Sequence, residues 1–178
     1  MLHGHRFLLR AGLTLGNVFA WVFVFEYFLS LSDSVSRASA GVLLMYGLSQ
    51  GITVLLTPLS AAQLRRGTRR ALVWATVLAA SAFIVLGATL GSFFDEKPIA
   101  WGIALFAILL GAYRALYFAP YELTRAEAES TVPEDRIFYE FLLALIQAFA
   151  GAALVMEAYA PLRLLFGAAA LIGISVLP

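Results

Sequence analysis

The sequence lacks cysteine and is poor in charge, because only 13% of its 178 residues are Asp, Glu, Lys or Arg. Without cysteine there is no disulfide, no thiolate metal site and no cysteine nucleophile. The two histidines, His3 and His5, lie in the amino-terminal tail, so no long apolar segment contains a histidine base. Zinc-hydrolase and nucleotide-binding loop motifs are also missing from the sequence. These absences predict a protein that is not an enzyme and that needs no metal or cofactor.

Neither sign of charge dominates, since the formal net charge at pH 7 is only +1. A nucleic-acid-binding surface would require a basic patch interleaved with aromatic side chains on a soluble face. The sequence provides no such face, so we expect no nucleic-acid partner.

Apolar side chains are abundant: they make up 62% of the residues, and the mean hydropathy is +0.89. Soluble domains contain about 45–50% apolar and about 25% charged residues, so much of this surface must meet lipid. In lipid, only helices and closed barrels satisfy every backbone hydrogen bond. The apolar runs are about twice as long as the roughly ten residues of a barrel strand and do not alternate, which predicts helices.

Six apolar segments approach or exceed the length of about 20 helical residues that a bilayer requires. Short polar or proline-containing turns separate several of them, for example at Asp33 and at Pro161. We therefore predict an all-α fold in which residues 1–178 form one domain, a six-transmembrane-helix bundle. The predicted spans are Phe7–Leu31, Ala38–Leu59, Ala71–Phe94, Pro98–Pro120, Ile137–Tyr159 and Leu162–Leu177.

Arginine and lysine are shared unevenly between the two sides of this predicted bundle, and cytoplasmic loops usually carry the excess. The richer side holds eight: Arg6, Arg10, Arg65, Arg66, Arg69, Arg70, Arg125 and Arg136. The other side holds three: Arg37, Lys97 and Arg163. We therefore expect both termini in the cytoplasm and the chain in the plasma (inner) membrane, in contact with the lipid bilayer. The arginines between the second and third spans set this orientation, and they could also bind anionic lipid.

Polar side chains line up on four of the predicted helices when each is plotted at about 100° per residue. The aligned sets are Arg10, Thr14, Asn17 and Trp21; Tyr46, Gln50, Thr53 and Thr57; Arg114, Tyr117, Tyr121 and Arg125; and Glu140, Ala144, Gln147 and Gly151. Because polar faces avoid lipid, we expect the first, second, fourth and fifth spans to surround a polar interior, with the third and sixth outside. The stripes either form a water-accessible path or are only hydrogen bonds between helices.

If the stripes form a water-accessible path, its lining is polar and aromatic. Its members are Asn17, Trp21, Tyr46, Gln50, Thr53, Arg114, Tyr117 and Gln147. An arginine within a bilayer costs about 2.5–3.5 kcal/mol, so Arg114 needs water or a partner, and Glu140 is the best-placed partner. Arg114 is thus either part of an anion-binding or proton-coupled site, or ion-paired with Glu140 to lock two helices. Glu26, toward the outer end of the first span, is a coupling carboxylate, a partner of Arg37 or Lys97, or a side chain that reaches the outer headgroup region.

The connection between the second and third spans carries a family resemblance. Pro58–Ala71 resembles motif A of the major facilitator superfamily, G-x-x-x-D-R-x-G-R-[RK], to which Arg65, Gly67 and Arg69 correspond. Three positions depart from the motif: Ser60 replaces its first glycine, Leu64 its aspartate and Thr68 an arginine.

Two further segments are similar to the same family. Gly111–Pro120 resembles its fourth helix, which carries an arginine, here Arg114. The segment from Glu127 to Arg136 resembles the acid, proline and arginine that precede its fifth helix. The resemblance covers the whole chain as the amino-terminal six-helix half of a transporter.

The resemblance implies two three-helix repeats, with helices 1, 2, 4 and 5 lining a cavity, and transport by alternating access. It implies a secondary active permease for a small-molecule solute, with a coupling proton or ion as a further ligand. The second half would be the carboxyl-terminal half missing from a partial sequence, which we favour, or a second copy of the chain. The alternative function is a non-transporting membrane scaffold or assembly subunit, in which the polar faces close into a dry bundle.

Overall fold

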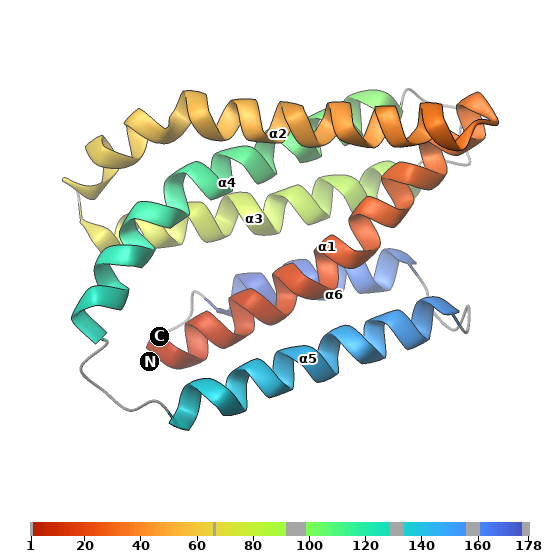
Figure 1. Ribbon diagram of the computed structural model, residues 1–178. Helices are drawn as coiled ribbons and strands as arrows, with labels where there is room; N and C mark the ends of the chain where they lie inside the picture. The colour runs from red at the N-terminus through yellow and green to blue at the C-terminus, as the bar shows by residue number, and fades with distance from the viewer. Residues whose placement is uncertain (1, 66, 92–98, 129–133, 156–160, 176–178) are drawn as a thin grey trace.

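The computed structural model describes residues 2–65, 67–91, 99–128, 134–155 and 161–175. This part of the chain is all-helical, which confirms the predicted fold class. Its six helices are α1 (Leu2–Ser32), α2 (Val35–Leu64), α3 (Thr68–Gly91), α4 (Ile99–Ala128), α5 (Glu134–Val155) and α6 (Pro161–Ile174) (Figure 1). Each predicted span overlaps one of these helices.

Four of the helices are long and apolar enough to cross a membrane. The qualifying segments are Phe7–Ser32, Val35–Leu64, Thr68–Leu90 and Ala100–Leu123. In α6 the corresponding apolar segment is shorter, Leu165–Ile174. The helices are those of a membrane protein, whereas the full count of six crossings stays a prediction.

Both α2 and α4 run through a proline, Pro58 and Pro120. A proline removes one backbone donor, and in membrane helices neighbouring hydroxyls commonly satisfy the backbone around it. Beside Pro58, the Thr57 hydroxyl donates to the Thr53 carbonyl and the Ser60 hydroxyl to the Thr57 carbonyl, both at 2.7 Å. The fourth helix continues past Pro120, where the predicted span ended, as far as Ala128.

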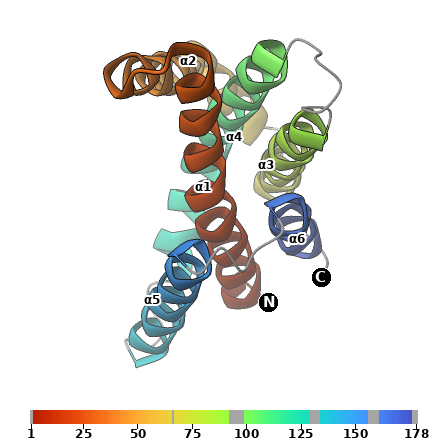
Figure 2. The ribbon, with the colours of Figure 1, turned by 90° about the vertical axis from the view of Figure 1, so that its right-hand side faces the viewer.

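The helices pack as two corresponding sets of three. α1 packs against α5 and α6, α4 packs against α2 and α3, and α3 packs against α6. Exchanging α1 with α4, α2 with α5 and α3 with α6 maps these contacts onto one another, whereas the contact between α1 and α2 has no comparable counterpart between α4 and α5 among the described residues. In the view along the bundle, α3 and α6 lie on one side of α1 and α4, and α2 and α5 diverge on the other (Figure 2).

The first and last described segments lie at the same end of the bundle. His5 Nδ1 is 2.6 Å from the carbonyl oxygen of Ser175, so the start of α1 is tied to the end of α6. This agrees with an even number of crossings, while the cytoplasmic location of that end stays a prediction.

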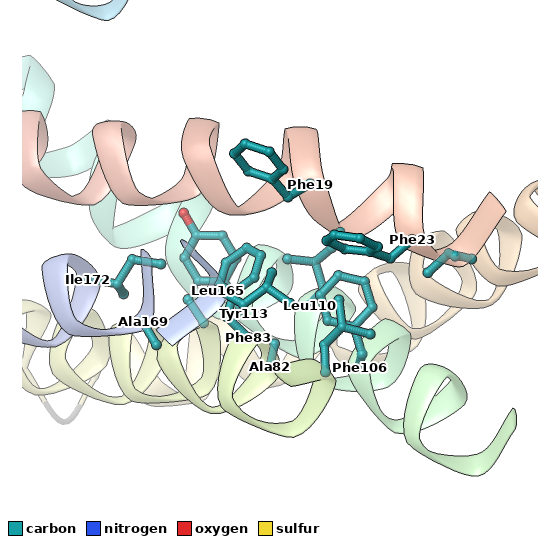
Figure 3. Close-up of a cluster of buried hydrophobic side chains, with 14 of the residues drawn as sticks. Phe19, Phe23, Ala82, Phe83, Phe106, Leu110, Tyr113, Leu165, Ala169 and Ile172 are labelled. Atoms are coloured by element: carbon teal, nitrogen blue, oxygen red, sulfur yellow. The ribbon is translucent and has the colours of Figure 1, made fainter. Parts of the chain in front are cut away.

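The apolar core lies between α1, α3, α4 and α6 (Figure 3). Phe19 of α1, Phe83 of α3 and Phe106 of α4 are fully buried there, together with Leu165 of α6. We expected the third and sixth helices, here α3 and α6, only to lie outside the polar interior. They build the apolar core on one side of α1 and α4, whereas α2 and α5 flank the other side.

The outer surface of the described helices is apolar. α2 is the clearest case, because Leu43, Leu44, Val54 and Leu55 are each about two-thirds exposed or more. Soluble proteins rarely expose apolar patches of more than a few hundred Å², so these side chains are suited to lipid. Trp74, near the start of α3, is 54% exposed, and Trp101, near the start of α4, is 77% exposed. Exposed tryptophans at both ends of a bundle are typical of the two membrane–water interfaces.

The turn between α2 and α3 depends on Gly67. Its amide donates to the Leu64 carbonyl at 3.0 Å, and its own carbonyl accepts from Ala71 at 3.2 Å, so it joins the two helices. Its φ is +116°, a backbone conformation that side chains with a Cβ rarely adopt. The glycine of the motif-like segment is therefore required by the backbone.

Gly67→Ala is expected to destabilise the fold by about 1–3 kcal/mol, because the added Cβ strains a positive-φ position. The thermal unfolding midpoint of the purified protein in detergent measures the effect. Gly51→Ala is the matched control: Gly51 is helical, and nothing lies within 4 Å of an added Cβ. Equal midpoints for the two variants would show that the turn tolerates a side chain.

Candidate functional site

The charged centre of the candidate site is Arg114, which lies midway along α4 and is half-buried. Its Nη1 donates to the Ser49 hydroxyl of α2 at 3.4 Å, a long hydrogen bond. Its guanidinium carbon also lies 5.6 Å from the ring centre of Tyr46, within the range of a cation–π contact. Both contacts are to neutral groups, so neither balances the positive charge.

Aromatic rings extend this site from α2 to α1. Trp21 of α1 meets Tyr46 edge-on, with ring centres 5.8 Å apart, and meets Phe106 of α4 in the same manner at 5.9 Å. Edge-to-face pairs at such distances are favourable by about 0.5–1.5 kcal/mol beyond the area that they bury. Trp21, Tyr46 and Arg114, three of the predicted pathway residues, thus meet where α1, α2 and α4 come together.

A close approach of α2 and α4 positions the guanidinium beside α2. The Thr53 hydroxyl donates to the Gly111 carbonyl of α4 at 3.1 Å and is also 2.9 Å from the Ser49 carbonyl of its own helix. A Cβ added at Gly111 would collide with the Ser49 carbonyl oxygen. Because Gly111 has no side chain, Ser49 lies close enough to α4 to accept from Arg114. Sequence reasoning did not single out Ser49 or Gly111 as site residues.

The polar face of α4 continues as a row of tyrosines. Tyr113, Tyr117 and Tyr121 follow one another at helical spacing, and the successive ring centres are 5.2 Å apart in both pairs. Tyr113 and Tyr117 are buried, and Tyr121 is half-buried. Tyr117, a predicted pathway residue, is therefore part of the packed interior of the helix set.

Two further predicted pathway residues carry side-chain amides, Asn17 on α1 and Gln50 on α2. The Asn17 side-chain oxygen on α1 is buried and has no hydrogen-bond partner. Asn17 precedes Trp21 by four residues, so both lie on one face of α1. Gln50 on α2 is half-buried and is adjacent to Ser49 in the chain. A buried acceptor without a hydrogen bond lowers the stability of the fold. The Asn17 oxygen is therefore available to accept a hydrogen bond from a donor that enters the site.

The remaining predicted residues lie elsewhere. Gln147 is exposed on α5, which packs against α1 rather than beside Arg114. Glu26 is exposed on α1. Arg65, Gly67 and Arg69 lie at the exposed junction of α2 and α3. The side chains of Glu140, Glu127 and Arg136 lie outside the described residues, so an Arg114–Glu140 ion pair stays a prediction.

The fold and the site define an all-helical protein with four helices long and apolar enough to cross a membrane, and with an arginine in the middle of one of them. No protein-family model matches the sequence, and neither a curated protein nor a solved structure is significantly similar to it. The function must therefore be argued from this chain's own residues.

Proposed function

We propose that this chain is a six-helix half of a secondary active solute transporter of the major facilitator type. The observation that carries the proposal is the environment of Arg114, whose contacts among the described residues, with Ser49 and Tyr46, are both to neutral groups. A charged side chain at this depth is costly unless it meets water or an opposite charge. Access of water and of an anionic solute to Arg114 removes that cost.

The helix arrangement supports the same proposal. The corresponding contacts of α1 with α5 and α6, and of α4 with α2 and α3, are those expected if two three-helix repeats exchange their outer helices. Each repeat has an odd number of helices, so the second would be inverted relative to the first, as in many transporters. α2 and α5 diverge on the side away from the apolar core (Figure 2). A second six-helix unit, either a carboxyl-terminal half or a second copy, would pack between these two helices and complete the cavity.

The residues around Arg114 suggest a class of solute. The guanidinium suits a carboxylate, sulfonate or phosphate group, which it can bind through two parallel hydrogen bonds. The rings of Trp21 and Tyr46 lie beside it and suit an aromatic or otherwise flat apolar body. We therefore propose an amphipathic organic anion as the solute, with the half-buried Gln50 as a further polar contact.

Aqueous accessibility tests the transporter proposal, and the absence of native cysteine makes it simple. Single cysteines at Asn17 and Gln50 are expected to react with a membrane-impermeant maleimide at least tenfold faster than cysteines at Leu44 and Leu55. The two control positions lie on the outer face of α2, 67% and 72% exposed, where lipid would surround them. Reaction is to be followed by gel shift in sealed vesicles.

The direction of access adds a second criterion. An alternating-access protein exposes its site to one side of the membrane at a time, so the faster rate should depend on the side to which reagent is added. If the cysteines at Asn17 and Gln50 are as unreactive as the controls from both sides, the helices form a dry bundle. The chain would then be a membrane scaffold or assembly subunit, and the transporter proposal would be wrong.

A further inference from the structure

A shallow depression of about 530 Å³ lies at the start of α3, far along the chain from the Arg114 site. Its lining residues are Gly67, Arg69, Arg70, Val73 and Trp74. Arg69 and Arg70 are exposed, and each precedes an apolar lining residue by four positions. Arg69 and Val73 therefore share one helical face, as do Arg70 and Trp74. The depression has a basic end and an apolar end, separated by about 6 Å along the helix.

Among the described residues, no acidic side chain balances this charge locally. The sequence contains no Asp or Glu between Asp33 and Asp95, a stretch that includes the end of α2 and all of α3. Arg65, the residue that follows α2, is also exposed and adds a third positive charge near the turn. Within the described part of the chain, no carboxylate forms an ion pair with Arg65, Arg69 or Arg70.

An apolar surface continues from this depression along α3. Trp74, Val77 and Ile84 are 54%, 44% and 47% exposed and lie at spacings that place them on one side of the helix. An exposed tryptophan beside arginines at a helix end is typical of the headgroup level of a bilayer. A ligand that fits all of these features has a negative group beside the arginines and hydrocarbon beside the apolar side chains.

We infer that the Arg69–Arg70–Trp74 depression binds an anionic phospholipid of the adjacent leaflet. The phosphodiester accepts hydrogen bonds from the guanidinium groups of Arg69 and Arg70, which match phosphate oxygens in geometry. The indole of Trp74 lies at the glycerol level, and the acyl chains follow Val77 and Ile84. This inference is independent of the transport proposal, because none of these residues touches the Arg114 site.

Quenching of Trp74 fluorescence by brominated lipid tests the inference in reconstituted bilayers. The full chain is placed in bilayers that contain dibrominated phosphatidylglycerol or dibrominated phosphatidylcholine. The Trp74 signal is the difference between the wild type and Trp74→Phe. We expect the anionic lipid to bind beside Trp74 at least tenfold more strongly than the zwitterionic one, because each arginine contributes roughly a fivefold preference.

Variants assign the preference to these arginines. Arg69→Gln/Arg70→Gln should abolish it, whereas Arg37→Gln, which removes an exposed arginine at the start of α2, should leave it unchanged. Because the Gln variant also removes charges expected to orient the chain, Arg69→Lys/Arg70→Lys is the second variant. It keeps both charges but loses paired hydrogen bonds, so its preference should be intermediate.

Three results would overturn the inference. Equal quenching by the two lipids in the wild type would show that the depression does not select anionic lipid. An unchanged preference in both double variants would place the anionic lipid elsewhere. Relief of quenching by millimolar glycerol 3-phosphate or inorganic phosphate would show that the site takes a soluble phosphate and not a lipid.

Discussion

Arg114→Leu is expected to leave the chain inserted and folded but to abolish binding of organic anions. Leucine at the centre of a membrane helix is favoured over arginine by about 3–4 kcal/mol on insertion scales, so insertion of α4 should improve. The loss of the guanidinium removes the positive charge of the proposed site, for which the neighbouring Ser49 and Tyr46 offer no substitute. Insertion can be measured with engineered glycosylation sites on either side of α4.

Anion binding can be measured without knowledge of the natural solute. In a Gln50→Cys background, benzoate and naphthalene sulfonate are probes that should slow labelling by maleimide. We expect this protection to weaken at least 100-fold in Arg114→Leu. Arg114→Lys keeps the charge but not the planar fork, so its protection should be intermediate.

Failure of Arg114→Leu to fold would assign Arg114 a structural role. If Arg114→Leu fails to fold, and Glu140→Ala fails in the same way, the two residues form an ion pair that locks α4 to α5. Removal of one partner of such a pair leaves an uncompensated charge, which costs about 3–5 kcal/mol. That result would remove Arg114 from the proposed anion site.

Gly111→Val is expected to destabilise the protein by about 1–3 kcal/mol, the usual cost of overpacking a close contact. The added Cβ would collide with the Ser49 backbone oxygen and would come within 3.0 Å of Ile52. Because one of these neighbours is backbone, no rotamer change relieves the collision, and α2 must move away from α4. The Thr53–Gly111 hydrogen bond and the Arg114–Ser49 contact would both weaken. The thermal midpoint in detergent and the probe protection at Gln50→Cys should therefore fall together.

Gly47→Val is the matched control for this prediction. Gly47 lies on the same helix as Ser49, but nothing lies within 4 Å of an added Cβ there. Valine is a better helix former than glycine, so the control should be neutral or slightly stabilising. If Gly111→Val also melts like the wild type, the close contact between α2 and α4 does not hold the site together.

Helical periodicity selected several side chains that the structure brings together. Trp21, Tyr46, Thr53 and Arg114 were chosen because each stripe had to avoid lipid, and all four lie at the junction of α1, α2 and α4. Gln147 was chosen by the same rule but is exposed on α5. Alignment on one face shows which side chains share a direction. It does not show which neighbouring helix, if any, that face meets.

Small residues escaped prediction for a related reason. Gly111 and Ser49 decide how closely α2 and α4 approach, yet glycine and serine are common in membrane helices and carry no signal of their own. Each of the two residues allows the close approach of α2 and α4 only because it lies opposite the other. The positive φ of Gly67 was likewise fixed by the turn between two helices, although the motif-like segment had pointed to this glycine.

The sequence by itself determined the solvent, the secondary structure and the candidate charge. A chain with 62% apolar residues must meet lipid, lipid requires the backbone to form helices, and an arginine midway along one of them needs an explanation. Only the tertiary structure decided which helix faces meet, that α3 and α6 build the core, and that Arg114 contacts Ser49 and Tyr46. The physical reason is that side chains facing lipid and side chains facing the core are equally apolar. Hydrophobicity alone therefore does not distinguish the two faces, and shape complementarity between helices makes the choice.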